Sequence, residues 1–311
     1  MTTIELDKVP ALRRDVQVMP SMCGHNPALY ARIGDWTWDT VGALCGVNVP
    51  RARSVSGAPT YLSFFYYRLR GSDLAHPHGL EFGDELTVTS ASFDFGSEAV
   101  HTLHRIGPRE PDGTPPLIDL GEFYGERRDD CLYVENMNRW VSRSMEGSNQ
   151  GLEVASPDGF RHWDLPRLPG DLSPRRDCGA ARKTRSFHPE GVPGATLAVV
   201  DSVESFTVDV ASELNGVGLL YFASFFAYVD RALLRLWRDM GRDNDSFLAK
   251  KVLDLRVCYF GNADAGQRLE ASTRLWQHTG RAGRETAEVV IRDGNDRLLA
   301  VAAVELLTAS A

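Results

Sequence analysis

The sequence predicts an α+β fold in which two similar units follow one another, each with one long helix and an antiparallel sheet. The length of 311 residues leaves room for about two domains. Helix-type and strand-type periodicities follow in the same order in both halves of the chain. Two short motifs also recur at offsets of roughly 185 residues, as an internal duplication predicts. They are Gly-x-x-Leu at Gly83 and Gly266, and an asparagine before a helix at Asn26 and Asn215.

In the first half, the pattern predicts a helix over residues 27–45. Pro27 suits the first turn of a helix, because its φ is compatible and its missing N–H is not needed there. Four apolar or small residues share one face of that helix: Leu29, Ile33, Trp36 and Thr40. An aromatic-rich strand is predicted over 61–69, and a long alternating segment over 83–106 indicates further strands.

The second half has the same order of elements. The predicted elements are a strand over 203–210, a turn at Asn215-Gly216, a helix over 217–237, a strand over 253–260, and an alternating run from Gly266 to Leu307 that turns back at Asp293-Gly294-Asn295. The first part of this helix is apolar on all faces and must therefore be buried. A buried helix wrapped by an antiparallel sheet describes a hot-dog fold, so two such units predict a double hot dog. Two unrelated α+β domains are the alternative.

The domain division follows from one segment of different composition. Residues 161–195 are rich in Gly, Pro and charged side chains and have no apolar periodicity, which predicts an irregular linker. The first hot-dog unit is therefore expected over 1–160 and the second over 196–311.

Composition and charge exclude several classes of protein. Hydrophobic residues make up 43% and charged residues 24%, as in ordinary globular proteins, so the chain as a whole is not disordered. A net charge of -8 argues against a protein that binds nucleic acid. The longest apolar stretch, 217–229, is too short to cross a membrane. Residues 1–8 lack a secretory apolar run and the five cysteines form no CxxC pair, so we expect a cytoplasmic protein. The oligomeric state stays open, and a homodimer is compatible with the sequence.

The sequence contains none of the common motifs that bind a metal or a cofactor. P-loop, dinucleotide-binding, zinc-protease and Gly-x-Ser-x-Gly patterns are all absent. His76 and His78 flank Pro77 in a loop predicted to be solvated, and the other histidines lack a spacing typical of metal ligands. We therefore expect no metal and no cofactor.

A candidate site lies where the second helix is expected to begin. A helix N-terminus offers free backbone N–H groups, which can stabilise a thioester carbonyl or an enolate. Gly216 and Gly218 would let a ligand approach the backbone, and Asn215 could add a side-chain donor. A turn with a helix cap is the simpler interpretation. The equivalent loop of the first half contains His25, either a general base or an ordinary loop histidine.

Two stretches of sequence carry a resemblance to a known family. They are residues 57–71, GAPTYLSFFYYRLRG, and residues 213–223, ELNGVGLLYFA. Both resemble the leinamycin-pathway family of bifunctional acyltransferase/decarboxylases, which are double hot-dog proteins of polyketide biosynthesis, and the resemblance extends over nearly the whole chain. It implies that the protein decarboxylates methylmalonyl-CoA and transfers the propionyl group to an acyl carrier protein. The coenzyme A thioester is then a substrate, and no cofactor is implied.

The resemblance also implies a nucleophile. The family's proposed nucleophile is a tyrosine on the strand after the first central helix, and this position falls on Tyr61, with Tyr66 and Tyr67 as nearby alternatives. A phenol with a pKa of about 10 is a poor nucleophile. The enolate left by decarboxylation could take its proton, and the acyl-tyrosine would then react with the thiol of the carrier protein.

Further residues are candidates for binding the substrate and the partner. Thr60 and Ser63 are candidate hydrogen-bond partners of the substrate. Arg68 is the candidate contact for the coenzyme A phosphates, in a stretch that also contains Arg51, Arg53 and Arg70. An acidic carrier protein would need a basic patch on this acidic chain, and five residues could form one: Arg175, Arg176, Arg182, Lys183 and Arg185. A solvated basic loop is the alternative.

Two other classes of function stay open. A hot-dog thioesterase or dehydratase would use a histidine or a carboxylate near the central helix, and the stretch around Asn215 offers no histidine. A non-catalytic module for acyl-CoA or an acyl carrier would bind coenzyme A without releasing CO2. Turnover separates these classes.

Overall fold

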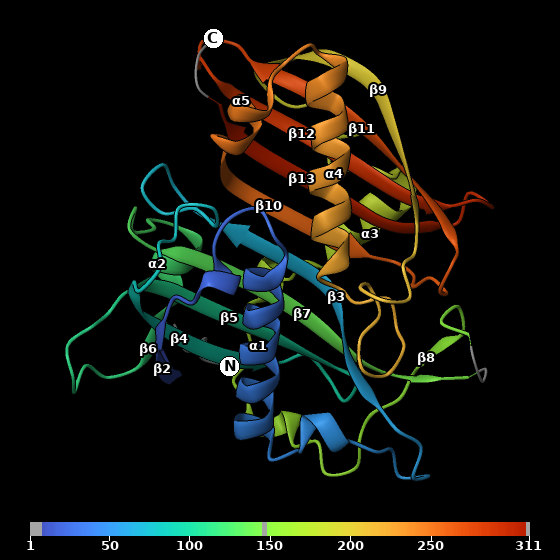
Figure 1. The fold of residues 1–311 in the computed structure, drawn as a ribbon. Helices are drawn as coiled ribbons and strands as arrows, with labels where there is room; N and C mark the ends of the chain where they lie inside the picture. Colours follow the sequence, from blue (N-terminus) through green and yellow to red (C-terminus); the bar gives the residue numbers. More distant parts are fainter. Residues whose placement is uncertain (1–7, 145–147, 309–311) are drawn as a thin grey trace.

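A computed structural model describes residues 8–144 and 148–308 and shows one large antiparallel sheet that carries two long helices (Figure 1). The first half contains β1 (Lys8–Pro10), β2 (Leu12–Gln17), α1 (Ala28–Cys45), β3 (Tyr61–Arg70), β4 (Glu85–Asp94), β5 (Ala99–Pro108), β6 (Leu117–Asp119), α2 (Leu120–Tyr124), β7 (Leu132–Arg143) and β8 (Leu152–Val154). After α3 (Arg175–Thr184), the second half contains β9 (Ala195–Thr207), α4 (Ser224–Asp239), α5 (Asn244–Leu248), β10 (Lys251–Tyr259), β11 (Arg268–His278), β12 (Arg284–Asp293) and β13 (Leu298–Leu307). The predicted α+β class is confirmed.

The two halves of the sheet have the same arrangement. The strand order is β2-β4-β5-β7-β3-β10-β13-β12-β11-β9, with β8 beside β7. In each half, the strand before the long helix lies at the edge and the strand after it lies at the centre. β3 and β10 pair antiparallel, with Arg68 opposite Arg256, so one continuous sheet joins the halves. This pseudo-two-fold arrangement is the predicted double hot dog.

α1 is the helix predicted over residues 27–45. Pro27 stands at its N-cap, and Gly46 ends it with φ of 67°, a left-handed conformation that glycine adopts without steric cost. The four residues predicted to share a face are all buried: Leu29, Ile33, Trp36 and Thr40. The helical periodicity therefore predicted both the helix and its buried face.

The second long helix, predicted from residue 217, begins only at Ser224. The reason is the side chain of Asn215, whose Oδ1 accepts hydrogen bonds from the N–H groups of Val217 and Leu219. These local bonds compete with helical ones, and Gly218 has φ of 74°, outside the helical region. The apolar stretch before Ser224 is therefore a loop that leads into the helix.

The two long helices meet at the centre of the molecule. The ring of Tyr30 on α1 stacks on that of Phe226 on α4, with centroids 4.1 Å apart. Tyr67 on β3 contacts both rings, and all three side chains belong to one core that extends through both halves. Because this core is shared, the halves support each other.

The segment expected to be an irregular linker contains a ten-residue helix, α3, so it is not irregular throughout. α3 lies on the side of the sheet opposite α1 and α4 (Figure 1), and its Cys178 packs with Tyr66, Met137 and Cys258. Only two α3 residues are buried, too few to give the sequence a clear period. The division into units at 160 and 196 stays a prediction. No helix in the described part of the chain is long and apolar enough to cross a membrane.

Candidate active site

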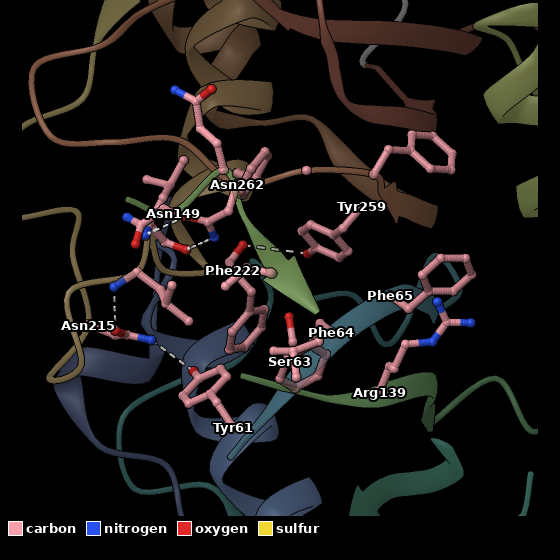
Figure 2. A pocket seen from close by; sticks show the side chains of 18 of the residues that line it. Tyr61, Ser63, Phe64, Phe65, Arg139, Asn149, Asn215, Phe222, Tyr259 and Asn262 are labelled. Atoms are coloured by element: carbon pink, nitrogen blue, oxygen red, sulfur yellow. Dashed lines mark hydrogen bonds between the residues drawn. The ribbon is translucent and has the colours of Figure 1, made fainter. Parts of the chain in front are cut away.

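The first half of β3 has an open edge. β10 pairs with residues 66–70 of β3, whereas residues 61–64 pair with β7 and have no described strand on the other side. The loop before α4 and the loop after β10 cover this edge and enclose a cavity of about 230 Å³ (Figure 2). We call this the central cavity; its wall includes Tyr61, Ser63, Phe64, Arg139, Asn149, Arg182, Asn215, Leu220, Phe222, Tyr259 and Asn262.

Tyr61 lies where three cavities meet. Besides the central cavity, it lines a cavity of about 540 Å³ that also includes Trp38, Arg51 and Leu219. A third cavity, of about 430 Å³, lies between α1 and the loop that contains Asn215. Tyr61 is therefore the residue that lines all three cavities.

Tyr61 and Asn215, one from each half of the chain, form a hydrogen bond. Asn215 Nδ2 donates to the phenol oxygen of Tyr61 at 2.9 Å (Figure 2). Because Asn215 is the donor, the proton of the phenol remains available for donation to a ligand. The structure thus brings together two candidate residues that were predicted from separate stretches of the sequence.

The surroundings of Tyr61 keep its phenol neutral. Burial raises the pKa of Tyr61 well above its ordinary value, and the hydrogen bond from Asn215 lowers it by a smaller amount. Trp38 meets the ring edge-on, with centroids 4.9 Å apart, which adds to the apolar surroundings. The phenol of Tyr61 therefore keeps its proton in the resting protein, because a free phenolate is disfavoured there.

Stacked aromatic rings form one wall of the site. Phe64 of β3 and Phe222 of the loop before α4 stack with centroids 3.8 Å apart. Gly34 of α1 makes room for this stack, because a Cβ at that position would lie 2.5 Å from Phe222 Cζ. A charged group placed against this wall would lose much of its hydration.

The loop before α4 contains several backbone N–H groups near the helix N-terminus. The N–H group of Gly218 already donates to the carbonyl of Asn215 at 2.8 Å, whereas Gly216 lines the third cavity and its N–H donates no hydrogen bond within residues 8–144 and 148–308. The N–H groups of Phe222 and Ala223, just before the helix, also donate no hydrogen bond in this part of the chain. The loop thus offers unpaired backbone donors at Gly216 and, later, at Phe222 and Ala223, whereas Gly218 is already paired.

The remaining candidates on or next to β3 differ in whether they line a cavity beside Tyr61. Ser63 lines the central cavity, and Thr60 lines the second cavity, where its buried hydroxyl has no hydrogen-bond partner among the described residues. Tyr66 and Tyr67, the alternatives to Tyr61, are buried and line none of the three cavities. Tyr61 is therefore the tyrosine of this strand that a ligand can reach.

Arg68 does not lie with Tyr61. Its guanidinium pairs with Asp254 on β10 at 2.5 Å, and both lie in a separate groove beside His188. Arg68 was expected at the mouth of the site, but its side chain is held by this ion pair, which also raises its pKa.

Other residues of the central cavity were not predicted from the sequence. Arg139 lies on β7 and lines the cavity. In the sequence it stands out only as a charged residue in a mostly apolar, buried strand. Asn262 follows β10 and uses its side chain to bond both the N–H and the carbonyl of Leu220. No local pattern marks Asn262, because its partner is distant in sequence.

His25 lies in a different part of the molecule from Tyr61. Its Nε2 is 3.1 Å from the carbonyl of Leu248, and its Nδ1 is 3.1 Å from Nζ of Lys250. Burial and the charge of Lys250 lower the pKa of His25. By the pseudo-two-fold relation, the loop before α1 contacts the start of β10 here, as the loop before α4 contacts the start of β3 at Tyr61.

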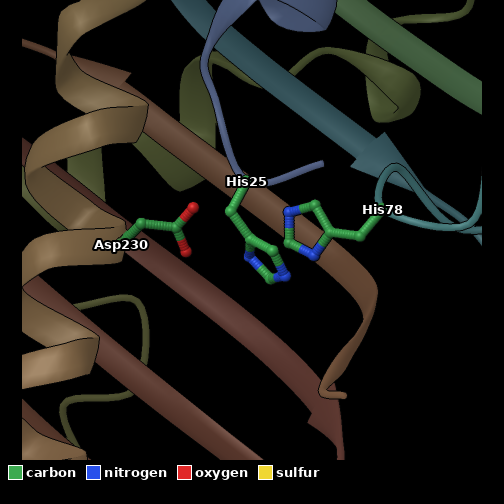
Figure 3. A group of neighbouring side chains, drawn as sticks. All are labelled: His25, His78 and Asp230. Carbon is green, nitrogen blue, oxygen red and sulfur yellow. The ribbon is translucent and has the colours of Figure 1, made fainter. Parts of the chain in front are cut away.

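The same cluster has the composition of a metal site but is filled by a lysine. Ligand atoms of His25, His78 and Asp230 lie within 4.8 Å of one another (Figure 3). The ammonium group of Lys250, fully buried, lies 3.3 Å from Asp230 and 3.1 Å from His25. The rings of His25 and His78 also pack against each other, with centroids 3.9 Å apart and planes tilted by 38°. The residues therefore do not fit a metal ion, because the ammonium already supplies the positive charge.

Solved structures with the same fold are described as thioesterases. An oleoyl thioesterase of Lactobacillus plantarum aligns with a TM-score of 0.59 and 11% identity, over 97% of both chains. A 12:0-ACP thioesterase of Umbellularia californica aligns at 0.57 and 9%, over 96% of this chain and 94% of the other. An acyl-ACP thioesterase of Bacteroides thetaiotaomicron aligns at 0.54 and 8%, over 95% of this chain and 97% of the other. At such low identity these matches establish the fold alone.

A sequence comparison identifies the family. No curated protein is similar enough to this chain to count as a match. A family model described as the LnmK N-terminal Hot Dog Fold domain matches residues 13–189, more than half of the chain and most of the predicted linker. The resemblance to the leinamycin-pathway double hot-dog family is thus confirmed, and the chain belongs to the LnmK hot-dog family.

Proposed function

We propose that this protein decarboxylates methylmalonyl-CoA and transfers the propionyl group to an acyl carrier protein through Tyr61. The observation that carries the proposal is the hydrogen bond between Tyr61 and Asn215 at the junction of three cavities. This arrangement gives a neutral phenol, an amide that can stabilise its anion, and space for an acyl group. Membership of the LnmK hot-dog family supports the same activity.

The apolar wall of the site favours loss of CO2. A carboxylate placed against Phe64 and Phe222 loses hydration, whereas the CO2 that leaves is neutral. The electron pair of the broken C–C bond passes into the thioester as an enolate. The N–H group of Phe222, which lines the central and third cavities, would stabilise the enolate oxygen, with the dipole of α4 behind it.

The raised pKa of Tyr61 supports an order of the steps in which decarboxylation precedes acyl transfer. Because burial disfavours a free phenolate, Tyr61 cannot attack the thioester first. Decarboxylation therefore comes first, and the carbon of the enolate takes the phenol proton. The phenolate, held by Asn215, then attacks the thioester carbonyl, the C–S bond breaks, and coenzyme A leaves as a thiolate. The thiol of the carrier protein attacks the resulting ester, and Tyr61 regains a proton from it.

Intact-mass analysis with methylmalonyl-CoA tests the proposal. The wild type should release CO2 and carry a propionyl adduct, which a holo acyl carrier protein removes. Tyr61→Phe should form no adduct. A matched control is Tyr124→Phe, which removes a phenol oxygen bonded to Glu135, and Tyr124 lines none of the three cavities.

Three results would contradict the proposal. No CO2 release by the wild type would exclude the decarboxylase, and tight coenzyme A binding without turnover would favour a non-catalytic binding module. An adduct that persists in Tyr61→Phe would exclude the tyrosine as nucleophile while leaving acyl transfer in place.

A thioesterase is the second candidate, because a carboxylate lies beside Tyr61. Asp35 of α1 lines the third cavity together with Tyr61 and Asn215, and burial raises its pKa. A carboxylate on the central helix could act as a general base for water. Asp35→Asn separates the two functions: it should abolish hydrolysis of acyl-CoA if the protein is a thioesterase, and should leave the propionyl adduct unaffected if it is not.

A further inference from the structure

Two arginines of the central cavity have no acidic partner among the described residues. Arg139 on β7 and Arg182 on α3 both line the cavity that contains Tyr61. The third arginine of this wall, Arg297, is held by Asp293 at 2.9 Å and by the carbonyl of Asn262 at 2.9 Å. Arg139 and Arg182 form no such pair in residues 8–144 and 148–308, so their guanidinium groups are available to an anion.

A further positive charge lies next to them. Arg175 is two turns before Arg182 on α3, so the two side chains project from the same side of that helix. Burial lowers the pKa of Arg175, and the nearby charge of Arg139 lowers it further. In a chain with net charge -8, Arg175 thus adds a positive charge close to Arg139, although Arg175 does not itself line the cavity. Their mutual repulsion would be relieved by a bound anion.

Aromatic rings hold two of these guanidinium groups. Arg139 lies over the ring of Phe65 at 5.1 Å, and Arg175 lies over the ring of Phe95 at 4.2 Å. Stacking on a ring fixes the plane of a guanidinium and leaves its N–H edge free. Such an edge is suited to paired hydrogen bonds with a phosphoryl group.

The wall of the central cavity runs along β3 from Tyr61 to Phe65, and Arg139 pairs with Ser63 between them. Tyr61, Ser63 and Phe65 are at alternate positions of the strand, and four residues of strand span about 13 Å. Figure 2 shows Tyr61 and Arg139 on opposite sides of Ser63. The cavity thus has a phenol at one end and a guanidinium at the other. A pantetheine arm has a thioester at one end and a phosphoryl group at the other.

We propose that Arg139 and Arg182 bind the phosphoryl group of a pantetheine arm whose thioester lies at Tyr61. The identity of the thioester rests on the proposed function, whereas the phosphoryl site rests on the two arginines. The phosphoryl group belongs either to coenzyme A or to the phosphodiester that joins the arm to a carrier protein. One site would then receive the donor and the acceptor of the acyl group in turn.

Calorimetric titration of three probes tests this site without any turnover. The probes are coenzyme A, 4′-phosphopantetheine and pantetheine, each added to the wild type and to the double variant Arg139→Ala/Arg182→Ala. We expect the double variant to bind both phosphorylated probes at least about tenfold more weakly, as the loss of charge-assisted hydrogen bonds predicts. Pantetheine should bind equally to both proteins. Arg139→Lys should bind the phosphorylated probes more tightly than the double variant and more weakly than the wild type. Lysine keeps the positive charge but lacks the paired N–H donors of a guanidinium.

Arg176→Ala is the matched control, because Arg176 lies on α3, is exposed and does not line the cavity. It should leave all three affinities unchanged. The inference would be overturned if the double variant Arg139→Ala/Arg182→Ala lost as much affinity for pantetheine as for the phosphorylated probes, or lost none for coenzyme A. A loss for coenzyme A but not for 4′-phosphopantetheine would move the contact to the nucleotide phosphates and overturn the shared site. Failure of the wild type to turn over methylmalonyl-CoA would contradict the proposed function only, since binding is measured separately.

Discussion

Asn215 has two separate contacts, one for each end of its amide. Its Oδ1 accepts hydrogen bonds from Val217 and Leu219 and shapes the loop, whereas its Nδ2 donates to Tyr61. The loop contact explains why α4 begins late, and the contact to Tyr61 supplies the stabilisation that a phenolate needs. The two roles can be separated by a substitution that keeps the oxygen and removes the donor.

Asn215→Asp is that substitution. The carboxylate can still accept from the loop N–H groups, but it cannot donate to Tyr61 and its charge repels a phenolate. We expect propionyl adduct formation to slow about tenfold to a hundredfold, as the loss of a charge-assisted hydrogen bond of about 1.5–3 kcal/mol predicts. Single-turnover intact-mass kinetics measures this rate, and circular dichroism shows whether the fold is kept. A rate equal to that of the wild type would remove Asn215 from the chemistry.

At the scale of elements, α1 and the loop before α4 fit together through a glycine. Gly34 is buried in α1, against the ring of Phe222. This close approach sets the position of the aromatic wall next to Tyr61. α3 also contains a glycine, Gly179, whose missing Cβ would face open space.

Gly34→Ala and Gly179→Ala form a matched pair of helix substitutions. The alanine at position 34 must displace Phe222, so we expect a loss of about 1–3 kcal/mol in the free energy of unfolding. The alanine at position 179 should stabilise the protein by up to about 1 kcal/mol, because glycine is unfavourable in a helix. Urea unfolding followed by circular dichroism measures both. A Gly34→Ala protein as stable as the wild type would show that Phe222 moves without cost.

His104 links the sheet to α1. It lies on β5, with Nε2 2.9 Å from Thr37 Oγ1 on α1 and Nδ1 2.8 Å from Ser90 Oγ on β4. Burial lowers the pKa of His104 to about 3, and the charge of Arg14 contributes in the same direction. The folded protein therefore keeps this histidine neutral at pH values where the unfolded chain protonates it.

This lowered pKa makes the fold sensitive to acid. The pKa of His104 is about 6.5 in the unfolded chain and about 3 in the folded protein. As the pH is lowered from 6.5 to 3, the unfolded state binds the proton more readily, so the free energy of unfolding decreases over this range. Between pH 7 and pH 5 the contribution of His104 should fall by about 2 kcal/mol. In His104→Gln the difference between urea midpoints at these two pH values should shrink accordingly. An unchanged difference would contradict a neutral, buried His104.

At the scale of the whole molecule, the two ends of the β3–β10 pair have diverged. One end carries Tyr61 and Asn215 at the meeting of three cavities. The other carries His25, Asp230 and the buried Lys250. A symmetric dimer of single units would have to repeat one arrangement at both ends, whereas a duplicated chain can specialise them. We therefore assign the chemistry to the Tyr61 end and a structural role to the His25 end.

His25→Ala tests this assignment. It removes the hydrogen bond to Lys250, so the free energy of unfolding should fall by about 1–3 kcal/mol, the cost of an unsatisfied buried donor. Adduct formation per folded molecule should stay at the wild-type level, because His25 does not contact Tyr61. Thermal unfolding and intact-mass analysis of the same sample measure the two effects. Loss of turnover in a stable His25→Ala protein would support a thioesterase with His25 as its base.

Local patterns predicted much of the fold and part of the site. The periodicity of α1 and the alternating strands depend on nearby residues, and so does the turn at Asn215. The predicted start of α4 was wrong. The side chain of Asn215 bonds the backbone of an apolar stretch that has a helical pattern on its own, and so holds it as a loop. The predicted position of Arg68 was wrong, because its partner Asp254 lies on a strand distant in sequence. Arg139 was not predicted, because the cavity that it lines is formed with distant strands and α3. Tyr61 was identified through the family resemblance, since the strand contains other tyrosines.

A crystal structure with a methylmalonyl thioester analogue that cannot lose CO2 tests most directly whether the thioester binds at Tyr61. We predict that its carbonyl lies within hydrogen-bond distance of the Tyr61 hydroxyl, beside Phe222, with the phosphoryl group toward Arg139. A thioester bound instead at the His25 and Lys250 end, or one whose carbonyl points away from Tyr61, would contradict the role proposed for Tyr61.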